Sequence, residues 1–215
     1  NLAISRAKTL FNAAYVNVTK DYKKWSTQIG LRCEHTHVIG KQIVYNTSFD
    51  TSYVQLFPSG FVGYKINEKN GLELTYSRRI NRPGYDQLNP FKFFLDPTTY
   101  KEGNPYLKPQ TTHSIEFSHV YKQKIYTTFG FGRTLNNITE VLAPSPTIAN
   151  TTIQTNTNLG KVDVYSFVIS LPLEIKKWWN MNSDLNIYYA SYTGNVANTP
   201  IKNVGKPTLN FNWVN

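Results

Sequence analysis

Three arginines stand close together where an alternating segment meets a proline–glycine pair. Arg78, Arg79 and Arg82 directly precede Pro83-Gly84. A guanidinium group binds carboxylate, phosphate or sulfate through two parallel hydrogen bonds, so three of them entering one loop could form an anion clamp. The alternative is that they pair with nearby carboxylates and pin the loop to its support. We expect the second arrangement. The carboxylates available to it are Glu73, Asp86, Asp96 and Glu102.

The loop that follows the arginines is rich in aromatic residues and closes with Gly103-Asn104-Pro105. Aromatic faces could stack on a sugar or another ring of a substrate. Compact loops also pack their own side chains together, and we expect a small loop core of this kind. The aromatics in question are Tyr85, Phe91, Phe93, Phe94, Tyr100 and Tyr106. The candidates for substrate or loop contacts are Arg78, Arg79, Arg82, Tyr85, Phe91, Tyr100, Asn104 and Tyr106.

Catalytic and metal-binding patterns are weak in this sequence. His35 and His37 fall on one face of an alternating segment, but no further His or Cys has ligand-like spacing. Ser, His and Asp occur without a recognisable nucleophile motif. Cys33 is the single cysteine, which excludes an intramolecular disulfide. We therefore expect no enzyme, no metal and no cofactor.

The segments that hold these residues alternate with the period of β-strands. Before the arginines, Leu72, Leu74 and Tyr76 share one face, and the residues between them are polar. The clearest apolar stripe runs along one face from Tyr165 to Leu173. Such strands, each of about ten residues, suit a membrane-spanning barrel. About nine of them are expected, joined by short turns that alternate with long loops.

Several local signals define the expected turns and loops. Tryptophans beside short turns are typical of an aromatic girdle at the membrane surface, and here they are Trp25, Trp178 and Trp179. Residues 39–50 and 143–157 are expected to be long polar loops. Pro58 should interrupt its strand because it cannot donate to a ladder. Strand pairing after the aromatic loop should resume near His113.

Composition favours a barrel over an ordinary soluble core. Aromatic residues make up 14% of the 215 residues and charged residues 17%, below the roughly 25% of soluble domains. No apolar run approaches the about 20 residues of a membrane helix, and no secretory signal is visible. The net charge of +10 comes from scattered Lys and Arg, which argues against nucleic acid as a partner. Lysines at 122, 124, 176 and 177 could meet anionic lipid headgroups, but a solvated rim is the expected reading.

Two strings carry a family resemblance: YSRRINRPGYDQLNPF from Tyr76, and EGNPYLKPQTTHSIEFS from Glu102. They resemble the TonB-dependent-receptor-like outer-membrane β-barrels common in Bacteroidetes, as does GLRCEHT from Gly30. Gln110 stands where that family usually has an acidic residue, so this position supplies no carboxylate to a nearby arginine. The resemblance implies an all-β, antiparallel, up-and-down transmembrane barrel in the cell outer membrane. Residues 1–215 would be one part of such a barrel, with the plug domain and remaining strands elsewhere.

The resemblance also implies uptake of a large nutrient, without catalysis. Expected partners are outer-membrane lipid, the plug and remaining strands, and, in the full-length protein, TonB and a surface lipoprotein. Two alternatives stay open. The chain could be a non-transporting outer-membrane barrel for adhesion, assembly or surface display. It could also be a soluble all-β binding module, whose stripe from Tyr165 to Leu173 would pack against a second sheet.

Overall fold

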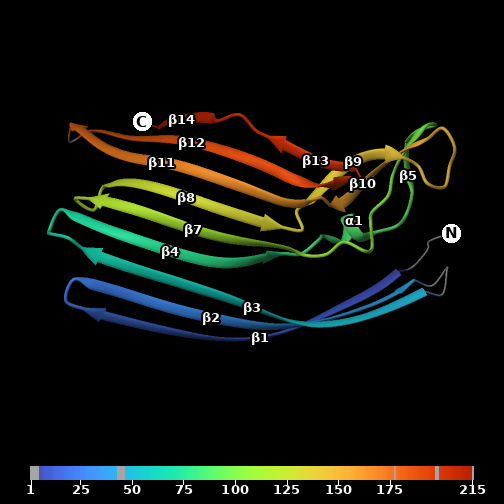
Figure 1. Ribbon diagram of the computed structural model, residues 1–215, viewed down its shortest axis with the longest axis horizontal. Coiled ribbons are helices and arrows are strands. Elements are labelled where there is room, and N and C mark those ends of the chain that lie inside the picture. Colours follow the sequence, from blue (N-terminus) through green and yellow to red (C-terminus); the bar gives the residue numbers. More distant parts are fainter. Residues whose placement is uncertain (1–4, 43–46, 177, 197–198, 215) are drawn as a thin grey trace.

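The computed structural model describes residues 5–42, 47–176, 178–196 and 199–214. In these ranges the chain is almost entirely antiparallel β-structure (Figure 1). The strands are β1 (Ser5–Tyr22), β2 (Trp25–Gln42), β3 (Thr47–Lys65), β4 (Asn70–Asn81), β5 (Phe93–Asp96), β6 (Thr99–Lys101), β7 (Gln110–Tyr121), β8 (Ile125–Leu135), β9 (Ile138–Pro144), β10 (Thr152–Asn158), β11 (Gly160–Lys176), β12 (Trp179–Val196), β13 (Thr199–Val204) and β14 (Thr208–Val214). The described helix, α1 (Tyr85–Leu88), has four residues, too few to cross a membrane.

One large sheet contains the strands that run the length of the molecule. Its order is β1-β2-β3-β4-β7-β8-β11-β12-β13, and β14 also pairs with β12. Because β13 pairs with Ser191–Val196 and β14 with Asn182–Tyr188, the two form a single pass along β12, interrupted at Gly205. The large sheet therefore makes nine passes in the described ranges, and the predicted number of about nine strands is confirmed.

The two faces of the large sheet differ in chemistry from β4 to β12. One row of register partners on the apolar face is Leu74, Phe117, Phe129, Phe167 and Ile187. A row on the other face is Thr75, Glu116, Gly130, Ser166 and Tyr188. Since successive side chains point to opposite faces of a strand, the period-two pattern of the sequence dictates this division.

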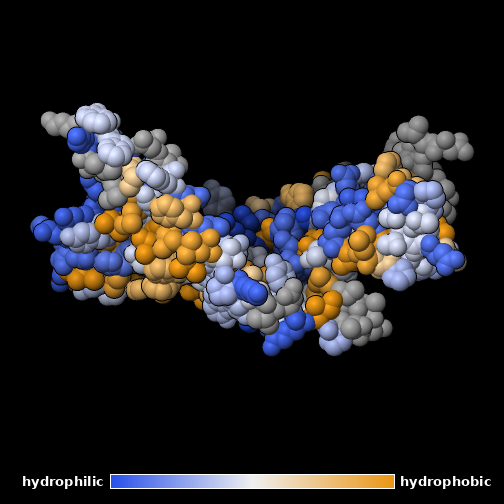
Figure 2. Space-filling view, turned by 90° about the horizontal axis from the view of Figure 1, so that it is seen from above, coloured by the Kyte–Doolittle hydropathy of each residue, from blue (hydrophilic) through white to orange (hydrophobic). Residues whose placement is uncertain are grey.

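Aromatic side chains pack across neighbouring strands on the apolar face. The rings of Phe129 and Phe167 lie 4.8 Å apart, and those of Phe131 and Tyr165 lie 5.0 Å apart. Cross-strand aromatic pairs of this kind stabilise a sheet. The face nevertheless stays open, because Phe129 and Tyr165 are 56% and 51% exposed. Figure 2, which looks onto the β14 edge, shows an apolar patch bordered by hydrophilic side chains on both sides.

A second, smaller sheet stands beyond one end of the large sheet (Figure 1). Its order is β5-β6-β10-β9, with β6 parallel to β10. β9 follows directly from β8 and β10 leads directly into β11, so this sheet grows out of the β8–β11 hairpin. The long loop between β4 and β7 adds β5 and β6 to it. We call these four strands the loop sheet.

Three sequence expectations about this end of the molecule need correction. The predicted loop 143–157 shrinks to residues 145–151, because β9 and β10 pair from Ile138 opposite Asn158 to Pro144 opposite Thr152. Most of residues 39–50 continues a hairpin, with β2 extending to Gln42 and β3 starting at Thr47. Pairing satisfies backbone groups that a polar composition alone does not reveal. The strand after the aromatic loop starts at Gln110, three residues before His113.

Pro58 has a different effect from the one expected. β3 runs through it without a break, paired to β2 with Pro58 opposite Leu31. Pairing of β3 with β4, however, ends at Ser59 opposite Ser77. In the described part of β3 before Ser59, the edge toward β4 is unpaired. Proline is tolerated at such an edge because no backbone donor is required. Beyond Ser59, toward the end that carries the loop sheet, the large sheet therefore divides into two arms. One arm is β1–β3, and the other begins with β4.

Candidate functional site

The arginine cluster lies where these two arms separate. Arg82 Nη2 donates hydrogen bonds to Glu34 Oε2 at 2.7 Å and to Thr36 Oγ1 at 3.1 Å, both on β2. Arg32 Nε lies 2.9 Å from the other oxygen of the same carboxylate. Thr36 is fully buried, and the Glu34 side chain is 13% exposed. The loop after β4 is thus attached to the polar face of β2.

Charge is retained on Arg82 despite partial burial. Burial alone lowers the pKa of its guanidinium, but hydrogen bonds to Glu34 and Tyr53 outweigh that effect and raise the pKa above its ordinary value. A charge-assisted hydrogen bond to a shielded carboxylate is among the stronger polar contacts in proteins. The side chain therefore acts as a permanently charged anchor.

The other two arginines differ from Arg82. Arg78 Nη1 donates to the Leu56 carbonyl oxygen at 2.8 Å, and its guanidinium lies 5.8 Å from the centre of the Phe57 ring. Arg79 is exposed on the polar face, opposite Thr112, and makes no ion pair among the described residues. The cluster is therefore split. Arg78 and Arg82 bind β3 and β2, whereas Arg79 is exposed on the polar face.

The loop is attached to the large sheet, as expected, but through partners other than the four expected carboxylates. Arg82 pairs with Glu34 rather than with any of the four carboxylates closer in sequence. Glu34 is 48 positions away, and sequence analysis missed it. The string GLRCEHT, which contains Glu34 and Thr36, was the available signal.

The two strings that carry the family resemblance pack against each other. Gly103 N donates to the Asn89 carbonyl at 2.7 Å, and Asn104 N donates to the Gln87 carbonyl at 2.7 Å. A Cβ atom on Gly103 would lie 2.5 Å from the Asn89 oxygen and 2.6 Å from its nitrogen. A glycine is required because the two backbones approach so closely.

Asn104 and Asn158 fasten the loop to β10. Asn104 Nδ2 donates to the Asn156 carbonyl at 3.1 Å. Asn158 Oδ1 accepts from Lys108 N at 2.8 Å, and its Nδ2 donates to the Lys108 carbonyl at 2.9 Å. Asn104 is therefore a loop-positioning residue in this structure. Asn158 was missed because an asparagine in a polar segment carries no sequence signal of its own.

The aromatic residues of the loop divide into a core and an exposed set. Tyr100 on β6 is fully buried, its ring 5.5 Å from that of Phe94 and its hydroxyl 2.7 Å from Ser145 Oγ. Phe91 is half-buried. The expectation of a loop core holds for Tyr100 and Phe91, whereas Phe94 is 53% exposed. The expectation is wrong for the exposed set of Tyr85, Phe93 and Tyr106, which are 58%, 68% and 87% exposed.

The two histidines do not assemble a metal site. His35 Nε2 lies 2.7 Å from Ser52 Oγ, and His37 Nε2 lies 2.6 Å from Asp50 Oδ1. Within the described residues, no group of three or more His, Cys, Asp or Glu side chains could hold a metal ion. The histidines therefore join β2 to β3.

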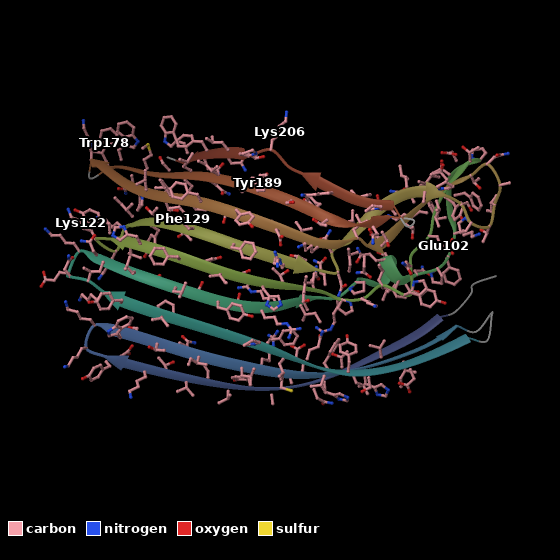
Figure 3. All side chains as sticks on the ribbon, viewed as in Figure 1. Glu102, Lys122, Phe129, Trp178, Tyr189 and Lys206 are labelled. Atoms are coloured by element: carbon pink, nitrogen blue, oxygen red, sulfur yellow. The ribbon has the colours of Figure 1, made fainter. Side chains whose placement is uncertain are left out.

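The tryptophans predicted to form a girdle lie at the opposite end of the molecule. Trp25 packs on Tyr64 at 4.5 Å, and Trp178 stacks on Trp179 at 6.2 Å. Figure 3 shows Trp178 and Lys122 at the short-turn end, with Glu102 at the far end of the molecule. The turns there are tight: Lys23 and Lys122 both adopt positive φ angles of 51°, as the turns favoured in β-hairpins require.

A family model described as "Outer membrane protein beta-barrel family" matches residues 8–215. The chain belongs to this family. It therefore lies in the outer membrane, with the apolar face of the large sheet toward lipid and the polar face toward the lumen. Membership in this family also excludes the alternative of a soluble all-β binding module. Short turns mark the periplasmic end and the loop sheet the extracellular end.

Solved structures show the same fold at low sequence identity. The siderophore receptor PirA from Pseudomonas aeruginosa matches with a TM-score of 0.59 and 12% identity, covering 88% of this chain and 46% of that one. A mutant of the ferric enterobactin receptor PfeA from Pseudomonas aeruginosa, in complex with enterobactin, matches with a TM-score of 0.51, 14% identity and coverages of 88% and 40%. The chain thus spans less than half the length of these receptors. No curated protein matches the sequence.

Proposed function

We propose that this chain forms part of the wall of a TonB-dependent-type uptake receptor for a large nutrient. The observation that carries the proposal is the division of the protein into a membrane wall and a braced extracellular loop sheet. Arg82, Glu34 and Asn158 hold the long loop in place over the end of that wall. An ordered loop at the mouth suits capture of a substrate, because the entropic cost of ordering it has been met before binding.

The lumen face supports passage of a large molecule. Gly130 and Gly132 leave little bulk on it, and Ser114, Ser118 and Ser166 line the same face. Arg79 places an open cation there. The resemblance of the fold to siderophore receptors supports the same class of function. In this scheme the plug gates passage and TonB supplies energy, as partners outside the residues described.

The test is deletion of the encoding gene in the source bacterium. Growth is measured with a ferric catecholate, a ferric hydroxamate or cobalamin as the limiting nutrient, and with large glycans as the carbon source. The proposal expects loss of growth on at least one, restored by the wild-type gene, and import that a protonophore abolishes. Unchanged uptake of every compound, together with reduced surface attachment, would favour the alternative of an adhesion or display barrel.

A further inference from the structure

Lysine side chains lie on aromatic rings at three of the short turns. Lys23 Nζ is 5.2 Å from the centre of the Tyr22 ring, Lys122 Nζ is 5.3 Å from that of Tyr121, and Lys176 Nζ is 5.4 Å from that of Trp178. An ammonium group over a ring face is held by the quadrupole of the ring. The same arrangement therefore recurs at the ends of three separate strand pairs. Figure 3 shows Lys122 and Trp178 at this end.

We define the short-turn rim as residues 20–25, 64–70, 121–126, 176 and 178–180. It contains two acidic residues, Asp21 and Glu68. Its lysines are Lys20, Lys23, Lys24, Lys65, Lys69, Lys122, Lys124 and Lys176, all exposed. Eight positive charges and two negative ones give +6, out of +10 for the whole chain. Among these described residues no lysine forms an ion pair with a carboxylate.

The long loop and the loop sheet have no comparable excess. Residues 82–109 and 136–161 contain five basic residues and four acidic ones, a net charge of +1. Some of these charged side chains also pair with each other. Lys101 Nζ, for example, lies 3.5 Å from Glu140 Oε2. The excess positive charge of the short-turn rim is therefore not matched by the long loop and the loop sheet.

The position of the rim lysines sets the chemistry of their partner. Trp25 and Tyr64 pack together at the edge of the apolar face, at the depth where aromatic girdles meet lipid headgroups. A lysine stacked on such a ring holds its ammonium at the depth of the phosphates. A rim built only for solubility would need neither the stacking nor the shortage of acidic residues.

We propose that the short-turn rim binds anionic glycerophospholipid headgroups of the periplasmic leaflet. Each stacked lysine meets a lipid phosphate, and its aromatic partner contacts the adjoining glycerol and upper acyl chain. This inference does not depend on transport. It assigns the excess positive charge to a lipid surface.

The test uses quenching of tryptophan fluorescence by lipids with brominated acyl chains. All four tryptophans of the chain are suited to it: Trp25, Trp178 and Trp179 lie in the rim, and Trp213 lies opposite Ser183 on β12, four residues from Trp179. The full chain is reconstituted in vesicles of phosphatidylcholine in which a fraction of the lipid is brominated phosphatidylglycerol or brominated phosphatidylcholine. The ratio of the two quenching curves gives the relative affinity for the anionic lipid.

The rim variant carries Lys23→Gln, Lys122→Gln and Lys176→Gln. The matched control carries Lys101→Gln, Lys108→Gln and Lys202→Gln, which remove the same charge toward the extracellular end. One lysine near an anionic surface contributes about a fivefold preference. We expect wild type and control to prefer phosphatidylglycerol by at least about fivefold, the rim variant to lose most of this preference, and 0.5 M salt to weaken it.

Folding of each variant is checked by heat-dependent mobility on a gel, and quenching by phosphatidylcholine should be equal in all three proteins. Equal affinity of the wild type for both lipids would overturn the proposal and leave a solvated rim. The proposal would also fail if the control lost the preference as fully as the rim variant. That result would assign the effect to net charge alone.

Discussion

Arg82 Nη2 lies 2.7 Å from Glu34 Oε2, although the two residues are 48 positions apart in sequence. Their contact joins the start of the long loop to the polar face of β2, and Arg32 shares the same carboxylate. One side chain on the wall thus holds two guanidinium groups, one from its own strand and one from the loop.

Glu34→Gln should loosen this loop without unfolding the barrel. Replacing the carboxylate weakens a charge-assisted hydrogen bond, which contributes about 1.5 to 3 kcal/mol. We expect trypsin to cut residues 82–109 at least several-fold faster, with β7 and β8 still protected. Glu102→Gln is the control, because the Glu102 side chain makes no ion pair among the described residues. Equal cleavage of both variants would contradict the anchoring role.

Gly103→Ala should disorder the contact between the two family strings. The new Cβ would lie 2.5 Å from the Asn89 oxygen and 2.8 Å from the Asp86 oxygen, so the backbone must move, at a cost of about 1 to 3 kcal/mol. Hydrogen exchange at the Asn104 amide, which donates to Gln87, is expected to accelerate. Gly84→Ala should leave it unchanged, since a Cβ there comes no closer than 3.9 Å to its neighbours.

The two faces of β7 should respond differently to an introduced charge. Phe117 belongs to the lipid face and Ser114 to the lumen face. A lysine toward lipid costs about 2–4 kcal/mol at the bilayer midplane, whereas a lysine toward water costs little. Urea unfolding in vesicles should therefore show strong destabilisation for Phe117→Lys and weak destabilisation for Ser114→Lys. The reverse order would invert the assignment of the faces.

Acid should loosen the loop sheet through Glu140, which lies outside the membrane. The hydrogen bond from Gln154 lowers the pKa of Glu140, and the charge of Lys101 adds to the effect. A carboxyl group whose pKa is lowered by folding stabilises the fold above its unfolded pKa, ordinarily 4.5. That stabilisation is lost as pH falls through the lowered folded value.

Hydrogen exchange at β10 amides, corrected for the intrinsic effect of pH, is therefore expected to rise below about pH 4.5, the ordinary pKa of a glutamic acid. Glu140→Gln should remove most of this dependence. A wild-type profile that stays flat down to the pH at which the barrel itself unfolds would show that Glu140 makes no such contribution.

The membrane wall could be predicted from the sequence, and most of the loop end could not. Alternation places Phe117, Phe129 and Tyr165 on one face because strand periodicity is fixed by backbone geometry. Trp25 and Trp178 mark the short turns for a similarly local reason. Contacts such as Arg82 with Glu34 depend instead on which strands become neighbours, and the sequence around Arg82 offers four nearer carboxylates.

The loop sheet escaped prediction for a related reason. Residues 152–158, TIQTNTN, contain one apolar residue, Ile153, so they lack the alternating contrast that marks a half-buried strand. They become a strand because β9 and β6 satisfy their backbone groups on either side. The parallel partner is remote in sequence, because β6 comes from the other long loop.

Backbone pairing between β3 and β4 ends at Ser59, and we call the unpaired line between the two arms beyond it the seam. Below it, backbone pairing of β3 with β4 continues from Ser59 opposite Ser77 to Lys65 opposite Gly71. Across the seam, guanidinium contacts from Arg78 and Arg82 bridge the two arms. Opening the seam requires side-chain hydrogen bonds to break but leaves the ladder below intact. The extracellular end of the large sheet is therefore mechanically softer than the membrane-spanning part that supports it.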